Sequence, residues 1–168
     1  NSNITFTTPV TRYWVDTNGG SWQTTASWSA TSGGASGATI PLPQDTAVFD
    51  ANSITIGSST ITLNQACLPS VDFTNILNSP TINHTLTNGV IYIFGDITYK
   101  TGLTVSGTTQ TQFCNHTGGT ITTAGLTTTY ATVLNTTGTY TMNGNLILSG
   151  TPAITQIVGT FDANNYNI

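Results

Sequence analysis

The chain has 168 residues, which suffices for one domain or a series of small repeats but not for two full-sized domains. Only 5% of the residues are charged, against about a quarter in an average globular domain. With two Lys or Arg residues in all, the chain cannot neutralise a phosphate backbone, so nucleic acid is excluded as a partner. The apolar runs are far shorter than the roughly 20 residues of a membrane-crossing helix, so no membrane span is predicted.

The composition favours strands over helices. Thr, Ser and Asn together make up about 40% of the chain, and Glu is absent. Thr, Val, Ile, Tyr and Phe favour strands, whereas the helix formers Ala, Glu and Lys are scarce or missing. We therefore expect an all-β fold with almost no helix.

Residues 1–50 differ in composition from the rest of the chain. They contain all three tryptophans, a glycine cluster and, close after it, a pair of prolines: Trp14, Trp22, Trp28, Gly33, Gly34, Gly37, Pro41 and Pro43. This pattern predicts an irregular module, held together by aromatic side chains, that caps the repeats that follow it.

Residues 51–168 carry short runs in which apolar and polar residues alternate, separated by turns rich in Gly, Asn and Pro. Gly-Thr strings beginning at Gly119, Gly138 and Gly159 recur at intervals of 19 and 21 residues. A spacing near 20 residues is the length of one coil of a β-solenoid. The pattern predicts a β-solenoid over residues 51–168 that continues beyond Ile168. A β-sandwich built from the same strands is the alternative.

The low charge is consistent with stacked coils. No charged residue lies between Thr101 and Phe161. Successive coils place equivalent side chains about 4.8 Å apart, where like charges repel but Thr and Asn can hydrogen-bond to one another.

A string of aromatic and glycine motifs opens the chain. It comprises Arg-Tyr-Trp-Val at 12–15, Gly-Ser-Trp at 20–22, Trp-Ser at 28–29, Ser-Gly-Gly at 32–34, Pro41, Asp45 and Val-Phe-Asp-Ala-Asn-Ser at 48–53. Over residues 12–75 the chain resembles a module of phage tail-fibre and other virion surface proteins, and of large secreted bacterial β-solenoid adhesins. Asp16 stands where that module commonly has Gly. The resemblance implies a displayed structural or adhesive protein and supplies no catalytic residue.

The tryptophans allow two interpretations. Trp14, Trp22 and Trp28 have flat faces suited to stacking on sugar rings, which makes them candidate glycan contacts. Alternatively, they form a small core that closes the end of the solenoid and prevents edge-to-edge pairing. We favour the second interpretation because a solenoid needs a cap, whereas it does not need a sugar site.

Two cysteines and four sequons are further candidate sites. Cys67 and Cys114 form either one disulfide or two buried thiols, and we favour thiols because small apolar Cys side chains pack well inside coils. Glycosylation in a secreted protein would fall on Asn3, Asn83, Asn115 and Asn135.

The chain offers little for catalysis or metal binding. Asp45 and Asp50 are the only acidic pair close in sequence, and residues five apart on a strand point to opposite faces. His84 and His116 lack any recognised ligand spacing and are interpreted as surface residues. We predict no cofactor, no metal site and no catalytic residue.

These observations predict a non-enzymatic structural or adhesive protein, with a phage tail-fibre or other virion-associated fibre segment as the first choice. The alternative is a cellular extracellular adhesin or pilus-like filament subunit, joined by donation of an N-terminal strand in which Ile4, Phe6 and Val10 alternate. A β-solenoid carbohydrate-active enzyme using Asp45 and Asp50 is a third hypothesis. We expect a homo-oligomer, either a trimer or a filament, that meets a host-surface glycan or protein at the virion surface or outside the cell.

Overall fold

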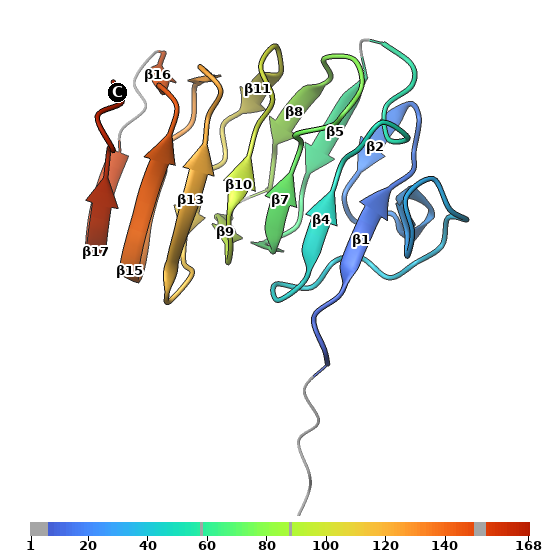
Figure 1. Cartoon of the computed structure of the whole chain (residues 1–168), viewed down its shortest axis with the longest axis horizontal. Helices are drawn as coiled ribbons and strands as arrows, with labels where there is room; N and C mark the ends of the chain where they lie inside the picture. The colour runs from blue at the N-terminus through green and yellow to red at the C-terminus, as the bar shows by residue number, and fades with distance from the viewer. Residues whose placement is uncertain (1–6, 58, 88, 150–153) are drawn as a thin grey trace, which may run out of the picture.

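A computed structural model describes residues 7–57, 59–87, 89–149 and 154–168. Apart from one short 3-10 helix, η1 (Thr25–Ser27), the regular elements of these residues are β-strands. The strands stack in parallel into a β-solenoid of about five turns (Figure 1). The predicted all-β solenoid is confirmed. The β-sandwich alternative is wrong because, within the described residues, every ladder except the one between β1 and β3 is parallel.

The front face of the solenoid in Figure 1 is a continuous parallel sheet. Its strands, in order, are β1 (Thr11–Trp14), β4 (Thr46–Val48), β7 (Ser70–Asp72), β10 (Ile97–Thr98), β13 (Gly118–Thr122) and the C-terminal parts of β15 (Thr132–Asn143) and β17 (Ile154–Asp162).

Two further faces complete each coil. The second face contains β2 (Gly19–Ser21), β5 (Thr60–Leu63), β8 (Thr81–His84) and β11 (Thr104–Gly107), followed by the separate pair β14 (Thr127–Thr128) and β16 (Ile147–Leu148). The third face contains β6 (Cys67–Leu68), β9 (Ile91–Ile93), β12 (Thr111–Phe113) and the N-terminal parts of β15 and β17. Because β15 pairs with β12 at one end and β13 at the other, it bends around a corner and joins two faces.

The number of residues per coil varies along the stack. This is seen from one column of inward-pointing side chains that lie in register on successive coils. This column aligns Ala47, Val71, Ile97, Ile121 and Met142, so the coils take between 21 and 26 residues. All five side chains are buried. The extra residues lie in the turns between faces, where insertions leave the ladder intact.

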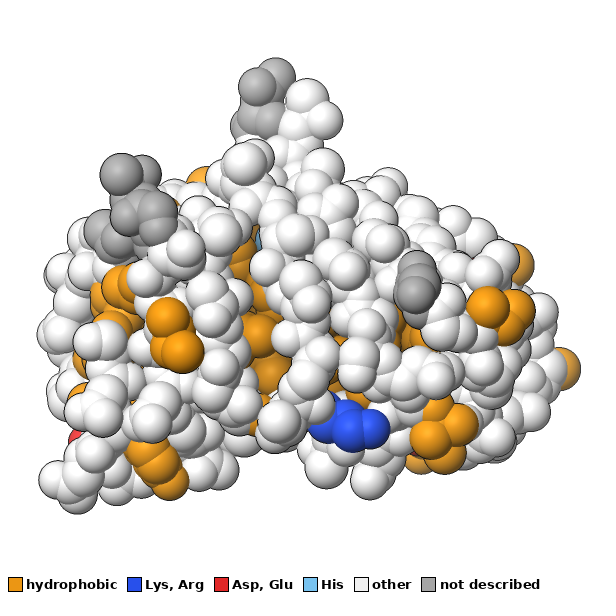
Figure 2. Space-filling view, turned by 90° about the horizontal axis from the view of Figure 1, so that it is seen from above, with side chains coloured by type: hydrophobic (Ala, Val, Ile, Leu, Met, Phe, Trp, Pro, Cys, Tyr) orange, Lys and Arg blue, Asp and Glu red, His pale blue; other side chains and the backbone are white. Residues whose placement is uncertain are grey.

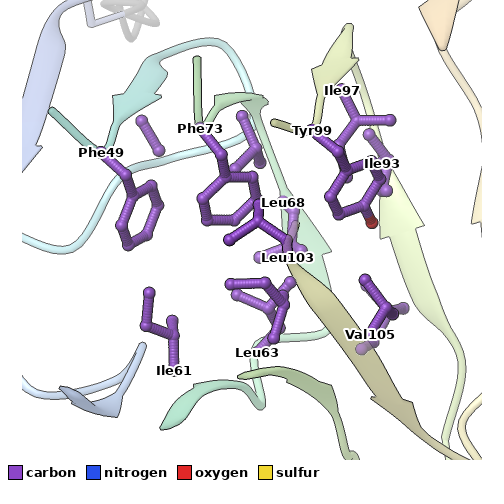
Figure 3. Close-up of a cluster of buried hydrophobic side chains, with 14 of the residues drawn as sticks. Phe49, Ile61, Leu63, Leu68, Phe73, Ile93, Ile97, Tyr99, Leu103 and Val105 are labelled. Atoms are coloured by element: carbon purple, nitrogen blue, oxygen red, sulfur yellow. The ribbon is translucent and has the colours of Figure 1, made fainter. Parts of the chain in front are cut away.

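Aromatic side chains form a second inward column. Their rings stack from coil to coil at the ends of the front-face strands: Trp14 is the last residue of β1, and Phe49, Phe73 and Tyr99 directly follow β4, β7 and β10. The ring centroids of Phe49 and Phe73 are 4.5 Å apart, and those of Phe73 and Tyr99 are 5.7 Å apart (Figure 3). Contact between successive coils therefore continues through the core as well as through the backbone ladders.

The N-terminal end of the stack is covered. β3 (Trp28–Ser29) pairs antiparallel with β1 and occupies the edge that would otherwise be open. β1 and β2 stack on β4 and β5 as the later coils do, so solenoid strands begin within residues 1–50. The insertion that carries η1 and β3 lies between β2 and β4.

Candidate functional site

The second face presents two rows of small polar side chains. Strands β5, β8 and β11 bury Ile61, Ile82 and Val105 in register, and the residue on either side of each points outward. One outward row is Thr60, Thr81 and Thr104, and the other is Thr62, Asn83 and Ser106. The face is uncharged along these strands and offers hydroxyl and amide groups at regular spacing.

Strand pairing on this face is interrupted between β11 and β14. β2, β5, β8 and β11 form one sheet and β14 with β16 another, with no ladder between the two within the described residues. A side-chain bond bridges the break, since the Thr129 hydroxyl donates to the Gly107 carbonyl oxygen at 3.3 Å. A groove of about 410 Å³, lined by residues 100–105, 123–127 and 129, lies at this seam.

The seam groove has a polar rim and an apolar floor. Leu103, Val105 and Leu126 are buried and line its floor. Lys100 also lines the groove, but its Nζ donates to the carbonyl oxygen of Ile76 on the preceding coil at 2.6 Å, on the side away from β14. In Figure 2 a hollow with hydrophobic side chains inside it lies beside a blue, basic side chain.

The three tryptophans lie in the core of the first coil. Trp14, Trp22 and Trp28 are all 0% exposed, and their rings meet at centroid distances of 5.1 Å and 4.7 Å. The Trp28 Nε1–H donates to the Trp22 carbonyl oxygen, and the Trp14 Nε1–H donates to the Asp16 carbonyl oxygen. With no ring face open to solvent, they cannot stack on a sugar in this conformation.

The two aspartates considered for catalysis both bind backbone groups. Asp45 is buried, and its two carboxylate oxygens accept the backbone N–H groups of Val10 and Leu42 at 2.9 and 2.8 Å. Asp50 accepts the backbone N–H of Asn52 at 2.8 Å within a turn. Asp50 thus fixes a local turn, whereas Asp45 ties the turn at Leu42 to the segment at Val10, and the two carboxylates do not converge on one cavity.

The interpretation of His84 as a surface residue is wrong. The alternation along β8 turns its ring inward, where it is fully buried and stacks on Tyr130 with a centroid distance of 4.5 Å. Its Nδ1 lies 3.0 Å from the Thr111 hydroxyl oxygen and its Nε2 lies 3.3 Å from the Tyr99 hydroxyl oxygen. Burial lowers the pKa of His84 to about 3 and raises the pKa of Tyr130 to about 12, so both groups are uncharged at neutral pH.

His116 lies in the turn before β13 and is exposed, as expected. Its Nδ1 is 2.8 Å from the Thr137 hydroxyl oxygen. Among the described residues, no group of three or more His, Cys, Asp or Glu side chains is arranged to hold a metal ion. Nor do these residues include a helix long and apolar enough to cross a membrane.

Both cysteines are free and partly exposed. Cys67 pairs with Tyr92 of the next coil, whereas Cys114 follows a strand one coil further on. Two coils amount to about 9.6 Å, which exceeds the Cα separation that a disulfide spans. Burial raises the pKa of the Cys114 thiol, so it is less reactive than an exposed cysteine.

Three of the four sequon asparagines lie on or beside the ladders. Asn83 is in β8, Asn115 precedes β13, and Asn135 is in β15, and all three are half-buried. Asn3 lies outside the described residues, as do Ile4 and Phe6 of the N-terminal segment considered for strand donation.

Sequence reasoning missed the seam groove. The strings Thr-Ile-Thr, Thr-Ile-Asn and Thr-Val-Ser predict the outward rows of β5, β8 and β11, but they do not show that strand pairing stops after β11. Comparison of the chain with protein-family models, with curated proteins and with solved structures finds no match.

Proposed function

We propose that this chain is a non-enzymatic structural element of a displayed fibre, with an adhesive surface. The observation that supports the proposal is the uninterrupted front sheet, which runs from β1 to β17 and is backed by a continuous core. Coils bonded to both neighbours by backbone ladders and packed side chains resist bending and proteolysis better than separate small domains do.

The outer surface is suited to display. Its rows of Thr, Ser and Asn place uncharged groups in register, and within them the Ser106 hydroxyl donates to Asn83 Oδ1 at 3.4 Å. Asp45 and Asp50, the pair considered for catalysis, accept hydrogen bonds from backbone N–H groups. These features favour a mechanical and adhesive role over catalysis.

A virion-associated fibre is our first choice, because of the motif resemblance in residues 12–75. We propose that the fibre is a homo-oligomer that meets a host-surface glycan or protein. A cellular adhesin or filament subunit is the alternative. The two proposals differ in the particle with which the chain should be found: a virion in the first case, and a filament or cell envelope in the second.

Density-gradient sedimentation of source material tests this choice. Each fraction is probed for the chain by peptide mass spectrometry and for encapsidated nucleic acid. Co-migration of the two supports a virion component, whereas recovery with filaments or envelope free of nucleic acid favours the cellular alternative. Recovery as a soluble monomer that turns over a polysaccharide would overturn the structural proposal.

A further inference from the structure

One inward position of the second face carries a hydroxyl group where other coils carry apolar side chains. The buried residues in register on β5, β8 and β11 are Ile61, Ile82 and Val105, and Thr128 of β14 pairs with Leu148 of β16. Thr128 is only 2% exposed, and its Oγ1 has no hydrogen-bond partner within the described part of the chain. Because Val has nearly the same shape as Thr, packing alone does not require a hydroxyl group here. A buried hydroxyl group without a partner destabilises a fold, so this one calls for a ligand.

A small cavity lies beside this hydroxyl group. Its volume is about 20 Å³, and its walls are mostly apolar side chains such as Leu126 and Met142. Thr128 and Tyr130 are among the residues that supply polar groups to it. A water molecule needs roughly 10–15 Å³ of such space and two or more polar partners. The cavity therefore has room for one water molecule and for no larger ligand.

Tyr130 stands at one end of a hydrogen-bonded chain that crosses the core. At the other end, the Thr111 hydroxyl oxygen lies 3.0 Å from His84 Nδ1. The Tyr99 hydroxyl oxygen lies 3.3 Å from His84 Nε2 and 3.4 Å from the Tyr130 hydroxyl oxygen. Each hydroxyl group and the neutral imidazole supply one hydrogen, so the three bonds use three of four hydrogens. If Tyr130 accepts from Tyr99, its own O–H is unused, and if it donates, its lone pairs are unused.

We propose that one water molecule binds in this cavity between the hydroxyl groups of Thr128 and Tyr130 and completes their hydrogen bonding. Water both donates and accepts, so it bonds to Tyr130 whichever way the hydrogens of the chain run. Thr132 lines the same cavity and offers a third hydroxyl group. A metal ion does not fit, because none of the described residues that line the cavity carries a carboxylate, imidazole or thiol group. This inference is independent of the proposed fibre function.

A high-resolution crystal structure of the chain tests the proposal directly. We expect density for one water molecule at about 3 Å from the hydroxyl oxygens of Thr128 and Tyr130. Thr128→Val keeps the branched shape but removes the hydroxyl group, so the density should be lost. Thr128→Ser removes only the methyl group and should keep it.

Thermal unfolding gives a second readout with a sign that distinguishes the two cases. If the water is bound, Thr128→Val should lower the melting temperature by about 3 °C, because a hydrogen bond is lost. If the hydroxyl group is unpartnered, its removal should raise the melting temperature instead. Thr123→Val is the matched control, because Thr123 lines the same cavity but donates to the Asn145 carbonyl oxygen at 2.6 Å. This variant should also lose stability, yet it should retain the density of the water molecule.

An empty cavity in the crystal structure of the parent overturns the proposal. So does a Thr128 hydroxyl group that bonds directly to another protein group, or a Thr128→Val variant that is at least as stable as the parent. Loss of the density in Thr123→Val would also overturn the assignment of the site to Thr128 and Tyr130.

Discussion

Burial of His84 makes the stability of the protein depend on pH. The ring is fully buried, and desolvation lowers its pKa from 6.5 to about 3. Above pH 6.5 the imidazole is neutral in the folded and the unfolded state, so it adds no pH dependence there. Below pH 6.5 the unfolded chain binds a proton that the folded chain excludes, so the free energy of unfolding falls until the pH approaches 3.

The size of this effect follows from the shift. One pKa unit corresponds to about 1.4 kcal/mol, so acidification from pH 6.5 to pH 4 should remove about 3 kcal/mol of unfolding free energy through His84 alone. That is a large part of the 5–15 kcal/mol typical of a folded domain. The groups that face the ring are the neutral Tyr99, Tyr130 and Thr111, so no buried carboxylate offsets the loss.

Urea unfolding between about pH 7 and pH 4, followed by far-UV circular dichroism and tryptophan fluorescence, measures this slope. His84→Gln should be less stable than the parent at pH 7 but lose about 3 kcal/mol less on acidification. His116→Gln is the control, because His116 sits in the same Asn-His-Thr tripeptide but is exposed. The reasoning is refuted if His84→Gln keeps the slope of the parent, or if His116→Gln flattens it.

Three further predictions concern packing and the cysteines. Phe73→Ala should lower the free energy of unfolding by about 4 kcal/mol, because the buried ring stacks between two others, and Phe73→Leu by about half of that; denaturant titration measures both. Gly95→Ala should cost about 2 kcal/mol, since its Cβ would lie 2.0 Å from a serine hydroxyl oxygen, whereas Gly57→Ala should be neutral in the same assay. After mild oxidation, intact mass spectrometry should find no internal disulfide between Cys67 and Cys114, and a loss of two hydrogens by the monomer would contradict this.

The alternation of apolar and polar residues, together with the turn residues, predicts the solenoid. It does so because each strand buries one face, and a buried position requires an apolar residue. The register between successive coils is harder to predict from the sequence. The sequence aligned Gly119 with Gly138, but the structure pairs Gly118 with Thr139, which moves the alignment by two residues. Side chains on a strand alternate with a period of two, so a slip of two residues leaves the inward and outward pattern unchanged.

The environment of single side chains was harder still to predict. His84 and His116 occur in identical tripeptides, yet one falls on an inward strand position and the other in a turn. Two neutral partners on other coils, Tyr99 and Thr111, satisfy the buried ring, and their proximity depends on register. The seam beside Lys100 likewise arises from a missing ladder between two coils, which no local pattern encodes.

The distribution of charge follows from the same ladder geometry. On the front face, Asp72 is in register with Val48 and Thr98, and Asp162 is in register with Thr141, so their paired neighbours on adjacent coils are neutral. Asp96 shows how one carboxylate is accommodated, since its oxygen accepts the backbone N–H of Thr120 at 2.7 Å. A second carboxylate about 4.8 Å away would repel it, which limits how many charges the stack tolerates.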